Sequence, residues 1–143
     1  MEQSTPNPAL NDLDALIGEW DVAVPMLTTA RGRVRVERAE GGAFLRLRSE
    51  APAPVPSSTM MIGRDDASGA YTALYHDSRG VSRLYQMGFA GGVWTMWRAA
   101  PGFHQRFSGT LSGDGSEIRA SWERSEDGSS WALDFDLTYT RTR

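Results

Sequence analysis

The stretch WALDFDLTYT, residues 131–140, alternates apolar and polar side chains from Leu133 onward. Its apolar face comprises Trp131, Leu133, Phe135, Leu137 and Tyr139. Alternation of this kind is typical of a β-strand that buries one face and exposes the other. The first predicted strand shows the same pattern, with one face formed by Trp20, Val22, Val24 and Met26.

Between these two segments, the chain divides into runs of strand length separated by short turns that are rich in glycine. Ten such runs lie near residues 18–27, 31–39, 43–51, 58–65, 70–77, 81–89, 93–99, 104–112, 117–125 and 130–141. Short links favour antiparallel neighbours in a meander, because parallel neighbours need long crossover connections. We therefore expect an all-β protein of about ten strands, in one domain spanning residues 1–143.

One segment before the first strand predicts a short helix. Asn7 can cap its start, Pro8 suits the first helical position, and apolar residues recur at helical spacing as far as Ile17. Gly18 then ends the helical pattern.

A meander of this length either closes on itself or splits into two sheets. Closure removes exposed strand edges, and a barrel of more than about eight strands leaves room for a ligand. The sequence therefore predicts an antiparallel up-and-down barrel with a short N-terminal helix. The one long link, residues 51–58, carries alternating prolines that exclude a central strand. This link is either a stiff surface connection or a flap over the barrel mouth.

Composition excludes several kinds of chemistry. The chain has no cysteine, which removes disulfides, thiolate metal sites and cysteine nucleophiles. All fifteen basic residues are arginine, so no Schiff-base lysine is possible. The formal charge is −3 and the arginines are scattered, which argues against nucleic acid as a partner. With no leader-like start and no apolar stretch near roughly 20 residues, we expect a cytoplasmic protein without a membrane span.

His76, Asp77 and Ser78 stand side by side but do not predict a hydrolase. Successive strand residues point to opposite faces, so the three side chains cannot converge as a catalytic triad requires. The run from Asp77 to Gly80 instead contains favoured turn residues and indicates a hairpin. Because the chain has two histidines without metal-ligand spacing, the sequence predicts no metal site.

A helix that runs into Gly18-Glu19-Trp20 and is followed by an antiparallel meander resembles the calycin superfamily of lipocalins, fatty-acid-binding proteins and nitrobindin-like barrels. In lipocalins the tryptophan of the Gly-x-Trp motif closes one barrel end, and an arginine near the last strand packs on it. The resemblance assigns these barrel-closing parts to Gly18, Trp20 and Arg141. Cation–π attraction between guanidinium and indole gives the pairing a physical reason.

Three further runs, Asp77–Val81, Gln105–Phe107 and Trp131–Asp136, are similar to uncharacterised bacterial lipocalin-like domains. That resemblance implies a fold and no settled activity.

Nitrobindin-like barrels bind ferric haem through a histidine, so the resemblance also raises haem or nitric oxide binding as an alternative. Their longer signature, Gly-x-Trp-x-Gly-x-Gly, is not met here, because Val22 and Val24 occupy the positions of the later glycines. The last two predicted strands also lack histidine. Haem would therefore have to use His76 or His104.

Aromatic and arginine side chains gather in the middle strands, and if they face inward they form an aromatic cavity with a buried guanidinium. A buried arginine must be paired, which for Arg83 or Arg106 implies Glu50, Glu123 or an anionic ligand group. The alternative is that both arginines lie outside and pair across strands. The candidate ligand-binding residues are Tyr71, Tyr75, Arg83, Tyr85, Trp97, His104, Arg106 and Phe107.

These features favour a monomeric or homodimeric carrier of a small apolar or amphipathic molecule. One alternative is a small barrel enzyme of isomerase or cyclase type, with His104 or a tyrosine as acid or base, and the other is the haem protein. An enzyme needs a titratable group within reach of its substrate, and a haem protein needs an inward histidine. A carrier needs neither, and the sequence identifies no catalytic residue and no required cofactor.

Overall fold

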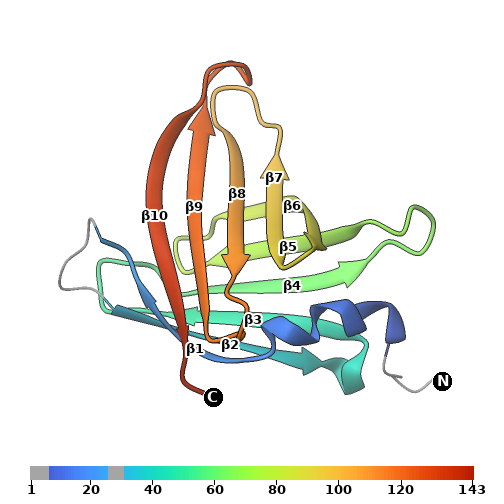
Figure 1. Ribbon diagram of the computed structural model, residues 1–143. Helices are drawn as coiled ribbons and strands as arrows, with labels where there is room; N and C mark the ends of the chain where they lie inside the picture. The colour runs from blue at the N-terminus through green and yellow to red at the C-terminus, as the bar shows by residue number, and fades with distance from the viewer. Residues whose placement is uncertain (1–6, 26–30) are drawn as a thin grey trace.

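The strands of the protein close into an antiparallel barrel. The structure, a computed structural model, describes residues 7–25 and 31–143. Each strand pairs with its neighbours in sequence, and β1 pairs with β10 to complete the barrel (Figure 1). The predicted all-β barrel of ten strands is therefore confirmed. Its strands are β1 (Gly18–Ala23), β2 (Arg31–Ala39), β3 (Phe44–Glu50), β4 (Ser58–Arg64), β5 (Tyr71–Asp77), β6 (Ser82–Ala90), β7 (Val93–Arg98), β8 (His104–Leu111), β9 (Glu117–Ser125) and β10 (Ala132–Arg141).

The first strand is shorter than the sequence predicts. The predicted run reached residue 27, whereas β1 ends at Ala23. Met26 was expected to share a face with Trp20, and it lies outside the described residues.

The predicted N-terminal helix is present as the 3-10 helix η1 (Pro8–Leu16), and a single turn, η2 (Glu40–Gly42), links β2 to β3. The Asn7 side chain caps η1 by accepting a hydrogen bond from the Ala9 amide at 3.0 Å. The helix lies against one end of the barrel (Figure 1) and buries its three leucines, Leu10, Leu13 and Leu16. Among the described residues, no helix combines the length and the apolar character that a membrane crossing requires.

Trp20 and Arg141 lie together at this helix-covered end. Trp20 is 1% exposed, and its indole nitrogen donates to the Leu16 carbonyl oxygen at 3.0 Å. The Arg141 guanidinium carbon lies 4.1 Å from the Trp20 ring centroid. The same guanidinium donates to the carbonyl oxygens of Ile17 and Ala15, both at 2.6 Å. One side chain therefore joins the last strand, the first strand and the end of the helix.

The third predicted barrel-closing residue, Gly18, provides the space for this cluster. Its φ of +144° is a conformation that residues with a Cβ rarely adopt. A Cβ at this position would clash with the Arg141 Nη1 atom and with the Arg143 carbonyl oxygen. Glycine is therefore required where the helix turns into β1.

The opposite end of the barrel is its mouth, formed by residues 51–57, 78–81, 99–103 and 126–131 between consecutive strands. The proline-rich link belongs to this end, where Val55 and Pro56 border the interior. The Ser57 carbonyl oxygen accepts a hydrogen bond from the Ser78 amide at 2.9 Å, which joins the link to the β5–β6 turn. The link is thus part of the mouth rather than a remote surface loop.

We predict that Trp20→Ala lowers the free energy of unfolding by about 3–5 kcal/mol, because it leaves a cavity beneath the guanidinium and the helix. Chemical denaturation followed by circular dichroism measures the change. Trp97→Ala is the matched control: Trp97 is 48% exposed, and its loss should cost no more than about 0.5 kcal/mol. Equal effects of the two substitutions would contradict the closing role of Trp20.

Candidate functional site

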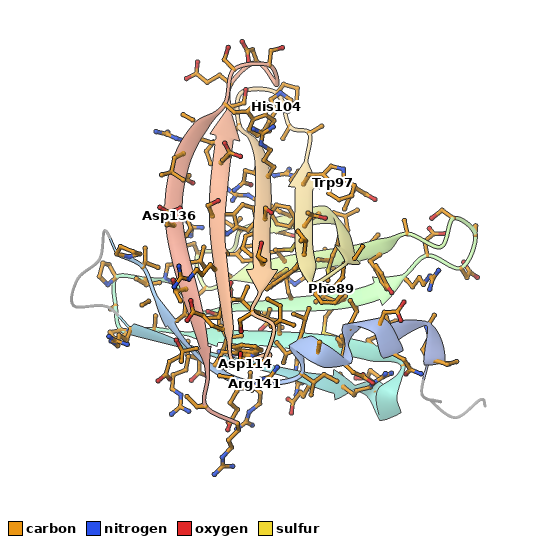
Figure 2. The ribbon with its side chains drawn as sticks, viewed as in Figure 1. Phe89, Trp97, His104, Asp114, Asp136 and Arg141 are labelled. Carbon is orange, nitrogen blue, oxygen red and sulfur yellow. The ribbon has the colours of Figure 1, made fainter. Side chains whose placement is uncertain are left out.

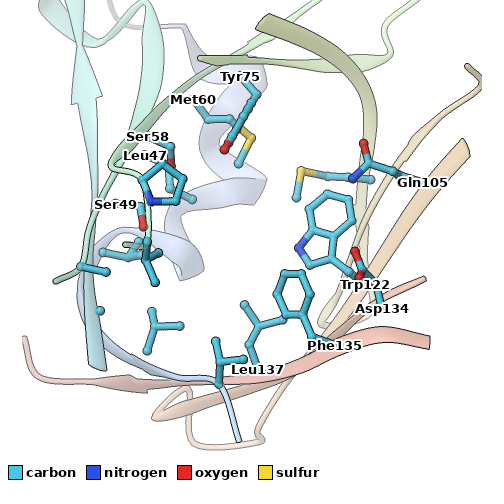
Figure 3. A pocket seen from close by; sticks show the side chains of 18 of the residues that line it. Leu47, Ser49, Ser58, Met60, Tyr75, Gln105, Trp122, Asp134, Phe135 and Leu137 are labelled. Carbon is cyan, nitrogen blue, oxygen red and sulfur yellow. The ribbon is translucent and has the colours of Figure 1, made fainter. Parts of the chain in front are cut away.

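A cavity of about 460 Å³ occupies the barrel interior between the mouth and the helix-covered end (Figure 3). It extends inward to Val22 and Tyr139, which are paired between β1 and β10. Val22 is the next residue after Trp20 on the inward face of β1. Most of its wall is apolar and includes Val34, Leu47, Met60, Met96, Trp122, Phe135 and Leu137. An apolar wall with few polar groups is typical of small-molecule sites.

A polar cluster on β6 and β8 faces this cavity near the mouth. The Gln105 Oε1 atom accepts hydrogen bonds from the Tyr85 hydroxyl at 2.9 Å and from Arg83 Nη1 at 3.4 Å. Gln105 is 7% exposed, and the Arg83 guanidinium lies 5.5 Å from the Phe103 ring centroid. Burial raises the pKa of Tyr85, while the Arg83 charge opposes that rise. The Tyr85 hydroxyl therefore stays protonated and donates a hydrogen bond to Gln105 Oε1.

No carboxylate of the described residues forms an ion pair with Arg83. The neighbouring arginine at the mouth, Arg79, is different. Its guanidinium lies 2.7 Å from Asp77, whose side chain has no exposed surface. Arg83 therefore presents to the cavity a positive charge that the described carboxylates leave unpaired.

Tyr75, Asp77 and Arg79 form a closed hydrogen-bonded group at the β5–β6 turn. The Tyr75 hydroxyl donates to Asp77 Oδ2 at 2.7 Å, and the Arg79 amide donates to Asp77 Oδ1 at 2.9 Å. Hydrogen bonds from Arg79 hold the pKa of Asp77 well below its usual range. Burial and the neighbouring carboxylate raise the pKa of Tyr75 to about 12. The predicted hairpin turn is confirmed, with the Gly80 amide donating to the Asp77 carbonyl oxygen at 2.9 Å.

A β-bulge brings one further carboxylate to the cavity wall. The pairing of β10 with β9 shifts between Leu133 and Phe135, so Asp134 is an extra residue that faces no residue of β9 in the strand register. A bulge changes the direction of the side chains around it. Leu133 is consequently 56% exposed, and Asp134 borders the cavity (Figure 3). The predicted inward face of this strand is therefore wrong at Leu133.

Trp131 lies before the bulge and also fails to face inward. Its ring stacks beneath the Arg106 guanidinium carbon, 4.1 Å from the ring centroid, on the outer face of the barrel. The predicted alternation holds for the remaining three apolar residues of the strand, Phe135, Leu137 and Tyr139, which all line the cavity.

Of the eight predicted ligand-binding residues, the structure brings three together at the cavity: Tyr75, Arg83 and Tyr85. Tyr71 lies instead at the helix-covered end, where its hydroxyl donates to the Ala9 carbonyl oxygen at 3.2 Å. Phe107 is buried in the core behind Trp122, with ring centroids 5.1 Å apart.

Trp97 lies on the outer face (Figure 2), and so does Arg106, which corrects their assignment to the cavity wall. Arg106 Nε donates to Glu123 Oε1 at 2.8 Å, so the expected partner is present but on the exposed side. The physical reason is strand alternation: because Phe107 points into the core, its neighbour Arg106 points outward. Glu50, the other proposed partner of an inward arginine, pairs with Arg48 on the outer face.

Neither histidine faces the cavity. His76 is exposed at an outward position of β5. His104 Nδ1 accepts a hydrogen bond from the Ala100 amide at 3.1 Å, and its ring packs beside Gly128 at the mouth (Figure 2). The donor set of the cavity therefore does not fit a haem held by histidine. In the part of the chain that the structure describes, no three side chains of His, Asp or Glu cluster as metal ligands.

Several residues of the wall were not predicted from the sequence, chiefly Gln105, Trp122, Asp134 and Tyr139. Gln105 was open to prediction, because it shares strand parity with the apolar Phe107. Tyr139 lies on the predicted apolar face of the last strand, and that face was not predicted to bind a ligand. Asp134 carried no sequence pattern, since a bulge depends on how two strands pair.

Comparison with known proteins supports the barrel and goes no further. No family model and no curated protein matches the chain. Among solved structures, it is similar to the crystal structure of Rv2717c from M. tuberculosis, with a TM-score of 0.63. The sequences are 18% identical over 96% of this chain and 99% of that one. At this identity the likeness establishes a shared fold.

We predict that Asp77→Asn destabilises the protein at neutral pH and has a smaller effect in acid. The pKa of Asp77 is lower in the folded protein than its ordinary value of 3.8, so its carboxylate stabilises the fold above that value. The stabilisation is lost as the pH falls toward the folded-state pKa. Urea denaturation at several pH values gives the difference in stability between parent and variant. Asp21→Asn, an exposed carboxylate on the outer face, is the control.

Proposed function

We propose that the barrel binds and carries a small amphipathic molecule, with its apolar body in the cavity and an anionic or carbonyl group at Arg83 and Gln105. The observation that carries this proposal is Arg83 itself. Its guanidinium lines an apolar cavity, and its one side-chain acceptor among the described residues is the neutral Gln105 oxygen at 3.4 Å. A guanidinium in such surroundings is stabilised by an anionic or polar acceptor.

Apolar burial would supply most of the affinity. At roughly 25 cal/mol per Å², a ligand that buries on the order of 200 Å² of apolar surface gains about 5 kcal/mol. The polar contacts at the mouth would then fix which end of the ligand faces outward. This division of roles is general for small-molecule pockets.

The tyrosines that line the cavity favour carriage over the isomerase or cyclase alternative. An acid–base catalyst works best with a pKa near the operating pH. Burial moves the pKa of Tyr75, Tyr85 and Tyr139 upward, away from neutrality. The Asp77 carboxylate is already engaged by Arg79. These groups are suited to hydrogen bonding a ligand rather than exchanging protons with it.

We further propose that the chain is a calycin-type barrel. The stack of Arg141 on Trp20 and the helix that ends just before Gly18 support this assignment. The low identity to Rv2717c does not extend it to a shared ligand.

We predict that Arg83→Met weakens the binding of dodecanoate by about tenfold to a hundredfold, because a charge-assisted hydrogen bond contributes about 1.5–3 kcal/mol. Isothermal titration calorimetry with the parent and the variant measures the change. Arg106→Met removes the same charge from the outer face and should leave the affinity unaltered.

Two results would count against the proposal. Parent protein that shows no heat of binding with dodecanoate would argue against carriage of an apolar chain. Equal losses in the two arginine variants would show that the effect reflects net charge rather than contact with the ligand.

A further inference from the structure

The inner end of the cavity holds a polar group that the protein leaves without a partner. Tyr139 is 8% exposed and lines the cavity. It pairs with Val22 on β1 and with Ile118 on β9. Val22 lies two residues from Trp20 on β1, so Tyr139 is close to the closed end. The described residues provide no hydrogen-bond partner for its hydroxyl, whereas the other two cavity tyrosines donate to Asp77 and Gln105.

The neighbouring Trp94 carries a second polar atom without a partner among the described residues. This atom is its buried indole nitrogen. The rings of Trp94 and Tyr139 lie 5.9 Å apart between centroids. Buried polar groups are nearly always paired, and an unpaired group costs free energy. No described residue accepts a hydrogen bond from the Tyr139 hydroxyl, and Tyr139 lines the cavity, so a partner has to come from inside the cavity.

Burial raises the pKa of Tyr139, so its hydroxyl stays protonated and can donate a hydrogen bond. The cationic side chains that line the cavity, Arg79 and Arg83, belong to its mouth. A charged ligand group placed against a lone hydroxyl would lose its hydration without gaining an opposite charge. The inner end therefore suits a neutral hydroxyl or carbonyl.

An apolar segment separates the two polar ends of the cavity. Along β10, Tyr139 lies four residues beyond Phe135, and Leu137 lines the cavity between them. Four residues of antiparallel strand span roughly 13 Å. The ligand that matches this wall has polar groups at both ends and an apolar body between them.

We propose that Tyr139 is the inner binding residue for a ligand with two functional groups, an acid held near Arg83 and a neutral hydroxyl or carbonyl held by the Tyr139 hydroxyl. This proposal rests on the proposed carrier function and specifies the chemical class of its ligand. It places the acid outward and the neutral group inward.

The test compares straight-chain acids, from octanoic to hexadecanoic acid, with their ω-hydroxy derivatives by calorimetric titration. For the chain length that reaches the inner end, the ω-hydroxy acid should bind about tenfold more tightly to the parent protein. Tyr139→Phe should remove this preference and leave the affinity for the unsubstituted acid unchanged. Tyr71→Phe is the matched control, because the Tyr71 hydroxyl binds Ala9 at the helix-covered end and should not affect the preference.

The outcomes separate the two proposals. Acids that bind without any preference for the ω-hydroxy derivative would overturn the role of Tyr139 and leave the carrier function standing. A preference that survives in Tyr139→Phe, or an equal loss of affinity for both members of a pair, would also overturn that role. If no acid of the series binds, the carrier function fails and the inner site fails with it.

Discussion

The stacking of Arg141 on Trp20 is the interaction on which the rest of the barrel depends. A closed sheet still has two open ends, and the apolar interior requires that one of them be covered. Arg141 is suited to this task because its planar guanidinium stacks on an indole and also donates to several acceptors. Here those acceptors are carbonyl oxygens at the end of the helix, so helix, first strand and last strand are held together. Gly18 is required because a Cβ would occupy the space that the guanidinium needs.

With one end closed, the proposed carrier function leaves the opposite end as the entrance for a ligand. The charges there are divided unequally: the buried carboxylate of Asp77 pairs with Arg79, and Arg83 is left with the neutral Gln105. Among the described residues that line the cavity, Arg83 is thus the one guanidinium that no carboxylate pairs with, so the proposed site offers an anionic group a single positive charge. The apolar wall beyond it excludes ligands that are charged along their length. The hydroxyl of Tyr139, which lines the inner end, is the second and neutral recognition point of the proposed site.

A predicted site residue faces the cavity where its neighbours along the strand correctly indicated which face of that strand points inward. Tyr75 and Arg83 face each other across β5 and β6 on the inward side, as their aromatic and apolar neighbours suggested. Phe107 and Arg106 were both assigned to the cavity, although adjacent strand residues cannot share a face. Because Phe107 lies in the core, Arg106 had to be outside. Consistent use of alternation would have removed Arg106 and introduced Gln105.

The sequence by itself determined the strands and their order, because alternation and glycine-rich turns are local patterns. The barrel-closing parts of Gly18, Trp20 and Arg141 were implied by a resemblance to known barrels. Tertiary structure alone decided which wall residues meet. The bulge that turns Asp134 inward arises from the pairing of β10 with β9, and no local pattern records it. The depth of the cavity, and the absence of a partner for the Tyr139 hydroxyl among the described residues, depend on side chains from strands far apart in the chain. Such properties exist only once the barrel has closed.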